Sequence, residues 1–128
     1  MSRMRRVLRP RVVSLWLPVA AWAAVIFALS SLQGLDSGLG VWDYVLRKLG
    51  HATEYAVLGA LLERALRRPL PAFVLGVAYA ASDELHQHFV PGRTGAPLDV
   101  AIDAVGVFVG IVAYRRLRSH GEPSERAA

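Results

Sequence analysis

Residues 12–31 carry no charged side chain, and this run constrains the fold more than any other feature of the chain. A helix rises about 1.5 Å per residue, so the run is long enough to cross the roughly 30 Å hydrocarbon layer of a bilayer. It follows the basic segment MSRMRRVLRPR, as the apolar part of a signal peptide would. However, it is longer than the roughly 7–15 residues usual there, and it contains Trp16 and Trp22. We therefore interpret it as an uncleaved membrane anchor.

Composition favours a membrane protein and excludes several other classes. Of the 128 residues, 54% are hydrophobic and 20% are charged, which is more apolar surface than a soluble domain of this size buries. Cysteine is absent, which excludes disulfides and thiolate metal sites. The basic residues separate the apolar runs, whereas a nucleic-acid-binding protein would gather them on one face between aromatic residues. We expect membrane lipids as partners and no nucleic acid.

Three further apolar runs follow the first, at residues 49–66, 72–89 and 98–116. Pro69 and Pro71 separate the second run from the third, and the turn VPGRTGAP separates the third from the fourth. The segment SGLGVWDYVLRK predicts a short amphipathic stretch in the membrane interface, and residues 119–128 predict a flexible tail. The sequence therefore predicts one all-α domain over residues 1–128, a four-helix antiparallel transmembrane bundle.

The basic residues predict how the bundle is oriented. Lys and Arg residues are enriched in loops on the cytoplasmic side of a membrane. Of the 15 basic residues, twelve lie before the first run, at the end of the second run or between it and the third, or at the end of the fourth run or after it. The other three are Arg47, Lys48 and Arg93. We expect both termini in the cytoplasm.

This topology brings ionisable and amide side chains of three spans to the outer face. Lys48, His51 and Tyr55 share one helical stripe at i, i+3 and i+7, and Asp99 and Asp103 share another. The third span contributes two adjacent faces, one with Asp83, His86 and Gln87 and the other with Glu84 and His88. Ionisable residues within a membrane are costly and are functional by default. We therefore predict a polar site that faces outward.

These motifs resemble the VanZ-like family of small bacterial membrane proteins. They are K-x-x-H-x-x-E-Y at the second run, DE-x-HQ-x-F-V-P-G-R at the end of the third and D-x-x-x-D-x-x-G at the start of the fourth. The residues that match the family pattern are Glu84, Gln87, Phe89, Pro91, Arg93, Asp99, Asp103, His51 and Tyr55. Asp103 stands where the family commonly has Asn. The resemblance implies a multi-pass protein of the bacterial inner membrane and an association with cell-envelope chemistry and teicoplanin resistance.

One interpretation of these residues is an enzyme that acts on an anionic lipid-linked or cell-envelope substrate. Glu84 or His51 would be the general acid or base, and Asp99 would orient a His or Arg. Arg93 and Lys48 would hold the anionic group. The remaining substrate-binding candidates are Gln87, Tyr55, His86, Asp103 and Asp83.

Other interpretations of the same residues stay open. They would serve equally well in a non-catalytic module that binds a head group or a partner protein, or in a salt-bridged network that fixes the helix ends. A metal site from Glu84, His88, Asp99 and Asp103 is a weaker alternative, because HExxH is absent. We assign no metal and name no cofactor. The G-x-x-x-G pair Gly106 and Gly110 favours close packing of helices, within the chain or between two copies.

Overall fold

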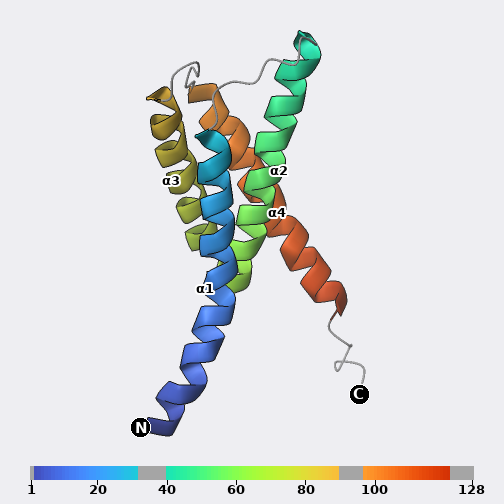
Figure 1. Ribbon diagram of the computed structural model, residues 1–128. Coiled ribbons are helices and arrows are strands. Elements are labelled where there is room, and N and C mark those ends of the chain that lie inside the picture. The colour runs from blue at the N-terminus through green and yellow to red at the C-terminus, as the bar shows by residue number, and fades with distance from the viewer. Residues whose placement is uncertain (1, 32–39, 90–96, 122–128) are drawn as a thin grey trace.

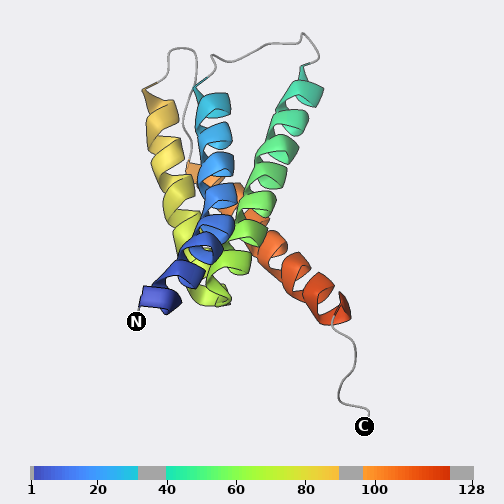
Figure 2. The same ribbon diagram turned by 60° about the horizontal axis from the view of Figure 1, so that its bottom comes forward.

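The computed structural model of this chain describes residues 2–31, 40–89 and 97–121, with side chains from residue 10 onward. These ranges contain no strand and four helices, α1 (Ser2–Ser30), α2 (Val41–Leu66), α3 (Pro69–His88) and α4 (Pro97–Gly121). The prediction of an all-α fold is confirmed. Consecutive helices run in opposite directions, so α2 and α4 run parallel and cross at a slant (Figures 1 and 2).

The two ends of the bundle differ in which helix termini they hold. One end, which we call the turn end, holds the start of α1, the end of α4 and the connection between α2 and α3 (Figure 1). The other end, which we call the polar end, holds the end of α1, the start of α2, the end of α3 and the start of α4. All the predicted site residues that the structure describes belong to helical segments near the polar end.

The helices extend beyond the apolar runs of the sequence. Residues 41–48 of the stretch expected to lie separately in the interface form the first turns of α2, which begins at Val41, and residues 37–39 of that stretch lie outside the described residues. α3 begins at Pro69 rather than after Pro71, because a proline in the first turn lacks an N–H that the helix would leave unpaired anyway. α4 continues to Gly121, so the start of the expected flexible tail is helical, and residues 122–128 lie outside the described residues.

A two-residue turn joins α2 to α3. Arg67 adopts the left-handed conformation, with φ 55° and ψ 23°, and its N–H donates to the carbonyl oxygen of Glu63 at 2.7 Å. Arg68 is extended, as a residue before proline prefers to be. Within the described ranges Arg67 is the one non-glycine residue with a positive φ. Glycine is the usual residue at such a position, because a side chain there costs about 1–2 kcal/mol.

Glycines let α2 and α4 pack backbone to backbone. A Cβ atom on Gly106 or on Gly110 would overlap the carbonyl oxygen of a facing α2 residue. Val107, which is fully buried, lies between Gly59 of α2 and Gly76 of α3. The G-x-x-x-G pair therefore serves packing within the chain, and it brings the first half of α4 against α2.

Hydrogen bonds to backbone carbonyls join α1 to α2. Pro18 has no N–H to donate to the carbonyl oxygen of Ser14, and the guanidinium of Arg64 donates to that oxygen at 3.2 Å instead. The indole N–H of Trp22 donates to the carbonyl oxygen of Glu54 at 2.8 Å. A proline within α1 thus frees an acceptor that a neighbouring helix uses.

The outer surface of the bundle is largely apolar. Two helical segments, Pro10–Ser30 and Pro97–Gly121, are long and apolar enough to cross a membrane, and the rest of the chain buries only 11% and 28% of their apolar windows. Leu17, Phe27 and Phe108 are 62%, 51% and 59% exposed. Exposed apolar surface on this scale indicates contact with lipid or another apolar partner. α2 and α3 are not in this class.

Candidate functional site

Polar side chains of three helices meet inside the bundle near the polar end. We call this group the polar column, and its members are Lys48, His51 and Tyr55 of α2, Asp83 and Gln87 of α3, and Asp99 and Asp103 of α4. The α2 members follow a single stripe for about 10 Å along the helix axis. Each of them faces a carboxylate from α3 or α4.

Lys48 and Asp99 form the outermost pair of the column. The Lys48 ammonium donates to Oδ1 of Asp99, and the two side chains are 23% and 13% exposed. The same ammonium lies 5.1 Å from the centroid of the Tyr44 ring, within cation–π range. The pair is open enough to meet a ligand from the polar end, and its two charges compensate each other.

His51 and Asp103 lie one turn deeper. Nδ1 of His51 is 3.8 Å from Oδ1 of Asp103, and the Asp103 side chain is only 2% exposed. That carboxylate oxygen accepts no hydrogen bond from the part of the chain that the structure describes. Three other carboxylates also act on Asp103 electrostatically, those of Asp83, Glu84 and Glu54. A buried acceptor without a donor is costly, so this position suits a hydrogen-bond donor or a proton.

Tyr55, Asp83 and Gln87 close the column at its inner end. The Tyr55 hydroxyl donates to Oδ2 of Asp83 at 3.0 Å, and the Gln87 amide donates to the same oxygen at 3.4 Å. All three side chains are buried, and Tyr55 is fully so. The other oxygen, Oδ1 of Asp83, accepts no hydrogen bond from the described residues. Tyr55 and Gln87 are thus occupied in holding Asp83.

Two of the predicted site residues that the structure describes, His86 and Glu84, lie outside the column. His86 faces α1, where its ring stacks on Phe27 with the centroids 4.3 Å apart and its Nε2 lies 2.9 Å from Oγ of Ser31. The Ser31 hydroxyl also lies 2.8 Å from the Phe27 carbonyl oxygen, to which it can donate its single proton while the imidazole donates to it. Glu84 is half-buried on α3, and Arg93 lies outside the described residues.

The pairing within the column differs from the sequence expectation at one point. The sequence predicts that Asp99 orients a His or Arg, but Asp99 contacts Lys48, and Asp103 is the carboxylate beside His51. The spacing of three residues on α2 and four on α4 could have suggested this pairing, had the offset between the two parallel helices been known. No sequence signal links His86 to Ser31, which lies 55 residues away.

Metal binding finds no support in the described ranges. There, no group of three or more His, Asp or Glu side chains is arranged to hold a metal ion. The weaker alternative built on Glu84, His88, Asp99 and Asp103 therefore has no geometric counterpart among these residues.

Comparison with known proteins identifies the family of this chain. The family model described as VanZ/LLP1 matches residues 3–118, which is nearly the whole chain. The chain belongs to the VanZ/LLP1 family. The polar column lies entirely within the matched residues, and the resemblance recognised in the motifs is confirmed. No curated protein and no solved structure gives a match. Membership of VanZ/LLP1, together with two helices apolar enough to span a bilayer, points to a membrane protein.

Proposed function

We propose that this VanZ/LLP1 member is an inner-membrane enzyme whose polar column acts on an anionic lipid-linked or cell-envelope substrate. The buried Asp103 carboxylate beside His51 is the main observation in its favour. Glycine contacts bring α2 against α4 at this level of the bundle. Ionisable groups inside membrane proteins are expensive and are usually retained for function.

His51 is the proposed general acid or base, and Asp103 is its positioning residue. A histidine changes protonation near neutral pH, and a carboxylate next to its ring can fix the orientation and stabilise the charged form. Asp103 thereby takes the role that the sequence suggested for Asp99. Glu84 is half-buried and acts electrostatically on Asp103, and it is the second acid–base candidate.

The anionic group of the substrate is proposed to lie at the outer rim of the column. The described part of the site holds more carboxylates than cations, so a negative head group would be repelled from its inner part. Lys48 is the partly exposed cation at the rim. Arg93 is proposed from the sequence to supply a bidentate contact to the same group.

The proposed topology has four spans, both termini in the cytoplasm and the polar end facing outward. It is supported by the bundle, in which the start of α1, the end of α4 and the α2–α3 connection lie at one end (Figure 1). Those segments, together with the last turn of α2, carry eleven of the 15 basic residues. The association of VanZ-like proteins with teicoplanin resistance is the reason for proposing an envelope component as the substrate.

Binding without turnover is the second candidate function. It is favoured by two pairs of the column that already hydrogen-bond to each other, Lys48 with Asp99 and Tyr55 with Asp83. Such pairs can hold a pocket in shape for a head group without taking part in chemistry.

Reconstitution separates the two functions. The purified chain is placed in vesicles of bacterial envelope lipid extract, and the lipids are compared by mass spectrometry before and after incubation. We expect a changed lipid species, formed at least about 100-fold more slowly by His51→Gln, because acid–base catalysis contributes about 10²–10⁴-fold. His88→Gln is the matched control, since His88 is an exposed histidine outside the column. A folded native chain that retains a lipid through purification and leaves every lipid unchanged would favour binding over catalysis.

A further inference from the structure

We propose a second site, at the turn end of the bundle, that binds one anionic phospholipid. Its phosphate would lie among arginines of α2 and α4, and an acyl chain would lie in an apolar groove between α3 and α4. This site is at the opposite end from the polar column, and it does not depend on the function proposed there.

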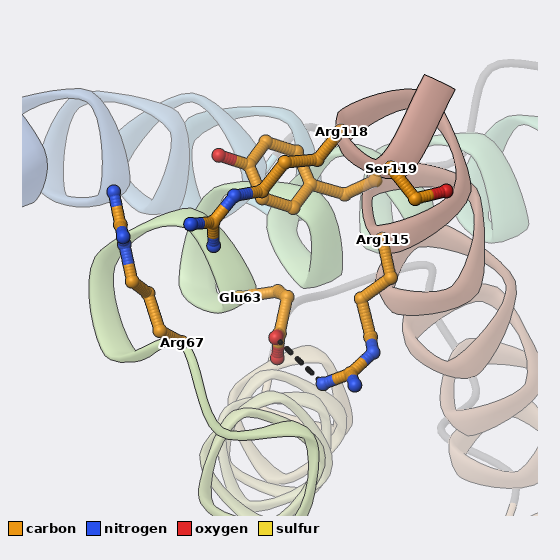
Figure 3. Close-up of a pocket in the computed structure, with 6 residues that line it drawn as sticks. Glu63, Arg67, Arg115, Arg118 and Ser119 are labelled. Atoms are coloured by element: carbon orange, nitrogen blue, oxygen red, sulfur yellow. Dashed lines mark hydrogen bonds and ion pairs between the residues drawn. The ribbon is translucent and has the colours of Figure 1, made fainter. Parts of the chain in front are cut away.

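A basic pocket provides the anion-binding part of this site. It has a volume of about 260 Å³ and is lined by Glu63, Arg67, Tyr114, Arg115, Arg118 and Ser119. Figure 3 shows the side chains of Arg115 and Arg118 reaching from α4 towards α2, where Glu63 and Arg67 lie. The described lining of the pocket thus holds three guanidinium groups and one carboxylate. Guanidinium groups bind phosphate oxygens through paired hydrogen bonds.

Glu63 holds one of these arginines in place. Its side chain is 3% exposed, and its Oε1 accepts a hydrogen bond from Arg115 at 3.3 Å. The Arg115 side chain remains 54% exposed, so it can contact a ligand as well. The carboxylate therefore orients Arg115 and compensates only part of the charge of the pocket.

Arg67 occupies a backbone position that glycine would fill without strain. Its φ of 55° lies in the left-handed region, where any side chain raises the energy of the backbone. An arginine at this position suggests that its side chain has a function, and its guanidinium lines the basic pocket.

The apolar groove begins where the basic pocket ends. It has a volume of about 640 Å³ and is lined by Pro69, Leu70, Phe73, Phe108, Ile111, Val112 and Arg115. Arg115 lines both cavities, so a ligand can occupy the two at once. Leu70 and Phe108 are 71% and 59% exposed, so the groove is open to its surroundings. α4 diverges from α3 towards the turn end (Figure 1).

The arginines beside the groove indicate which kind of ligand fits the two cavities. An anionic phospholipid has a negative head group and an apolar chain in the order that the two cavities require. Arg115 and Arg118 belong to the last turns of a candidate membrane span, the depth at which basic pockets meet anionic head groups. A second copy of this chain would bring the same arginines to the groove, and their charges would repel.

Native mass spectrometry of the purified chain in detergent tests the proposal. The chain is titrated with phosphatidylglycerol, with phosphatidylcholine of the same acyl chains, and with glycerol phosphate as the anion without a chain. We expect one phosphatidylglycerol per chain, preferred over phosphatidylcholine, and binding about fivefold weaker in Arg118→Gln. Arg116→Gln is the matched control, because Arg116 is an exposed neighbour that does not line the pocket. Arg115 is left intact, since Glu63 depends on it.

Groove variants test the acyl chain separately. Val112→Trp fills the groove and should abolish lipid binding, whereas Val109→Trp, on the exposed α4 surface outside the groove, should not. Equal retention of the two lipids would overturn the proposal. If glycerol phosphate competed for the site as well as the lipid does, and Val112→Trp left lipid binding unchanged, the acyl-chain part of the proposal would be wrong and the pocket would be a site for a free anion. If the chain bound no lipid and instead formed a dimer that Val112→Trp dissociates, the groove would serve self-association and the lipid proposal would be wrong.

Discussion

Replacing Tyr55 by phenylalanine removes one hydroxyl from the inner end of the polar column and changes little else. That hydroxyl is buried and donates to Oδ2 of Asp83 at 3.0 Å. After the change, the same oxygen keeps only the Gln87 amide at 3.4 Å, and the other carboxylate oxygen accepts no hydrogen bond from the described residues. Tyr55→Phe therefore leaves a buried carboxylate with one long hydrogen bond.

The loss follows from the burial and from the charge of the acceptor. Hydrogen bonds between transmembrane helices contribute about 0.6 kcal/mol on average and about 1.7 kcal/mol at most. Hydrogen bonds to charged groups contribute about 1.5–3 kcal/mol. Because both partners are buried and the acceptor is a carboxylate, we expect Tyr55→Phe to lower the free energy of unfolding by about 1.5 kcal/mol, roughly a tenfold change in the folding equilibrium.

The assay is reversible unfolding in mixed micelles, arranged as a double-mutant cycle with Asp83→Leu. Removing both partners should cost about 1.5 kcal/mol less than the sum of the single changes, because each single change already removes the same Tyr55–Asp83 hydrogen bond. Tyr44→Phe is the control, since the Tyr44 ring is 56% exposed and should change stability by less than about 0.5 kcal/mol. A coupling energy near zero, with Tyr55→Phe as mild as Tyr44→Phe, would refute the hydrogen bond as described.

Two further changes probe the packing and the topology. Gly110→Ala should lower the free energy of unfolding by about 1–3 kcal/mol, because the added methyl overlaps α2. Gly50→Ala is the control, since a methyl there meets open space and should raise the free energy of unfolding by up to about 1 kcal/mol. Equal effects of the two changes in a thermal or detergent titration would contradict the contact between Gly110 and α2. The chain has no cysteine, so Ser31→Cys and Gly121→Cys can each be labelled cleanly with a membrane-impermeant maleimide on whole cells. We expect labelling of position 31 from outside and of position 121 only after permeabilisation, and labelling of both from one side would contradict the four-span topology.

Much of the fold is contained in local patterns of the sequence. The four apolar runs and the breakers between them predict four helices, because hydrophobicity and backbone propensity act over a few residues. The helix ends were predicted less well. α3 begins at Pro69, since proline fits a first turn as well as it breaks a later one.

The candidate site was predictable as a set of residues and not as a set of pairs. Helical periodicity places Lys48, His51 and Tyr55 on one stripe, and the structure keeps them together. Their partners depend on the offset between α2 and α4, which the glycine contacts decide. That offset puts Asp103 beside His51.

The sequence by itself determined which segments are helical, which of them are apolar enough for a membrane and which stripes carry polar side chains. Only the tertiary structure decided that His86 turns to α1, that Asp99 meets Lys48, and that Glu63 and Arg115 meet in a basic pocket at the turn end. The physical reason is that a helix repeats within four residues, whereas the approach of two helices depends on which small side chains let their backbones touch.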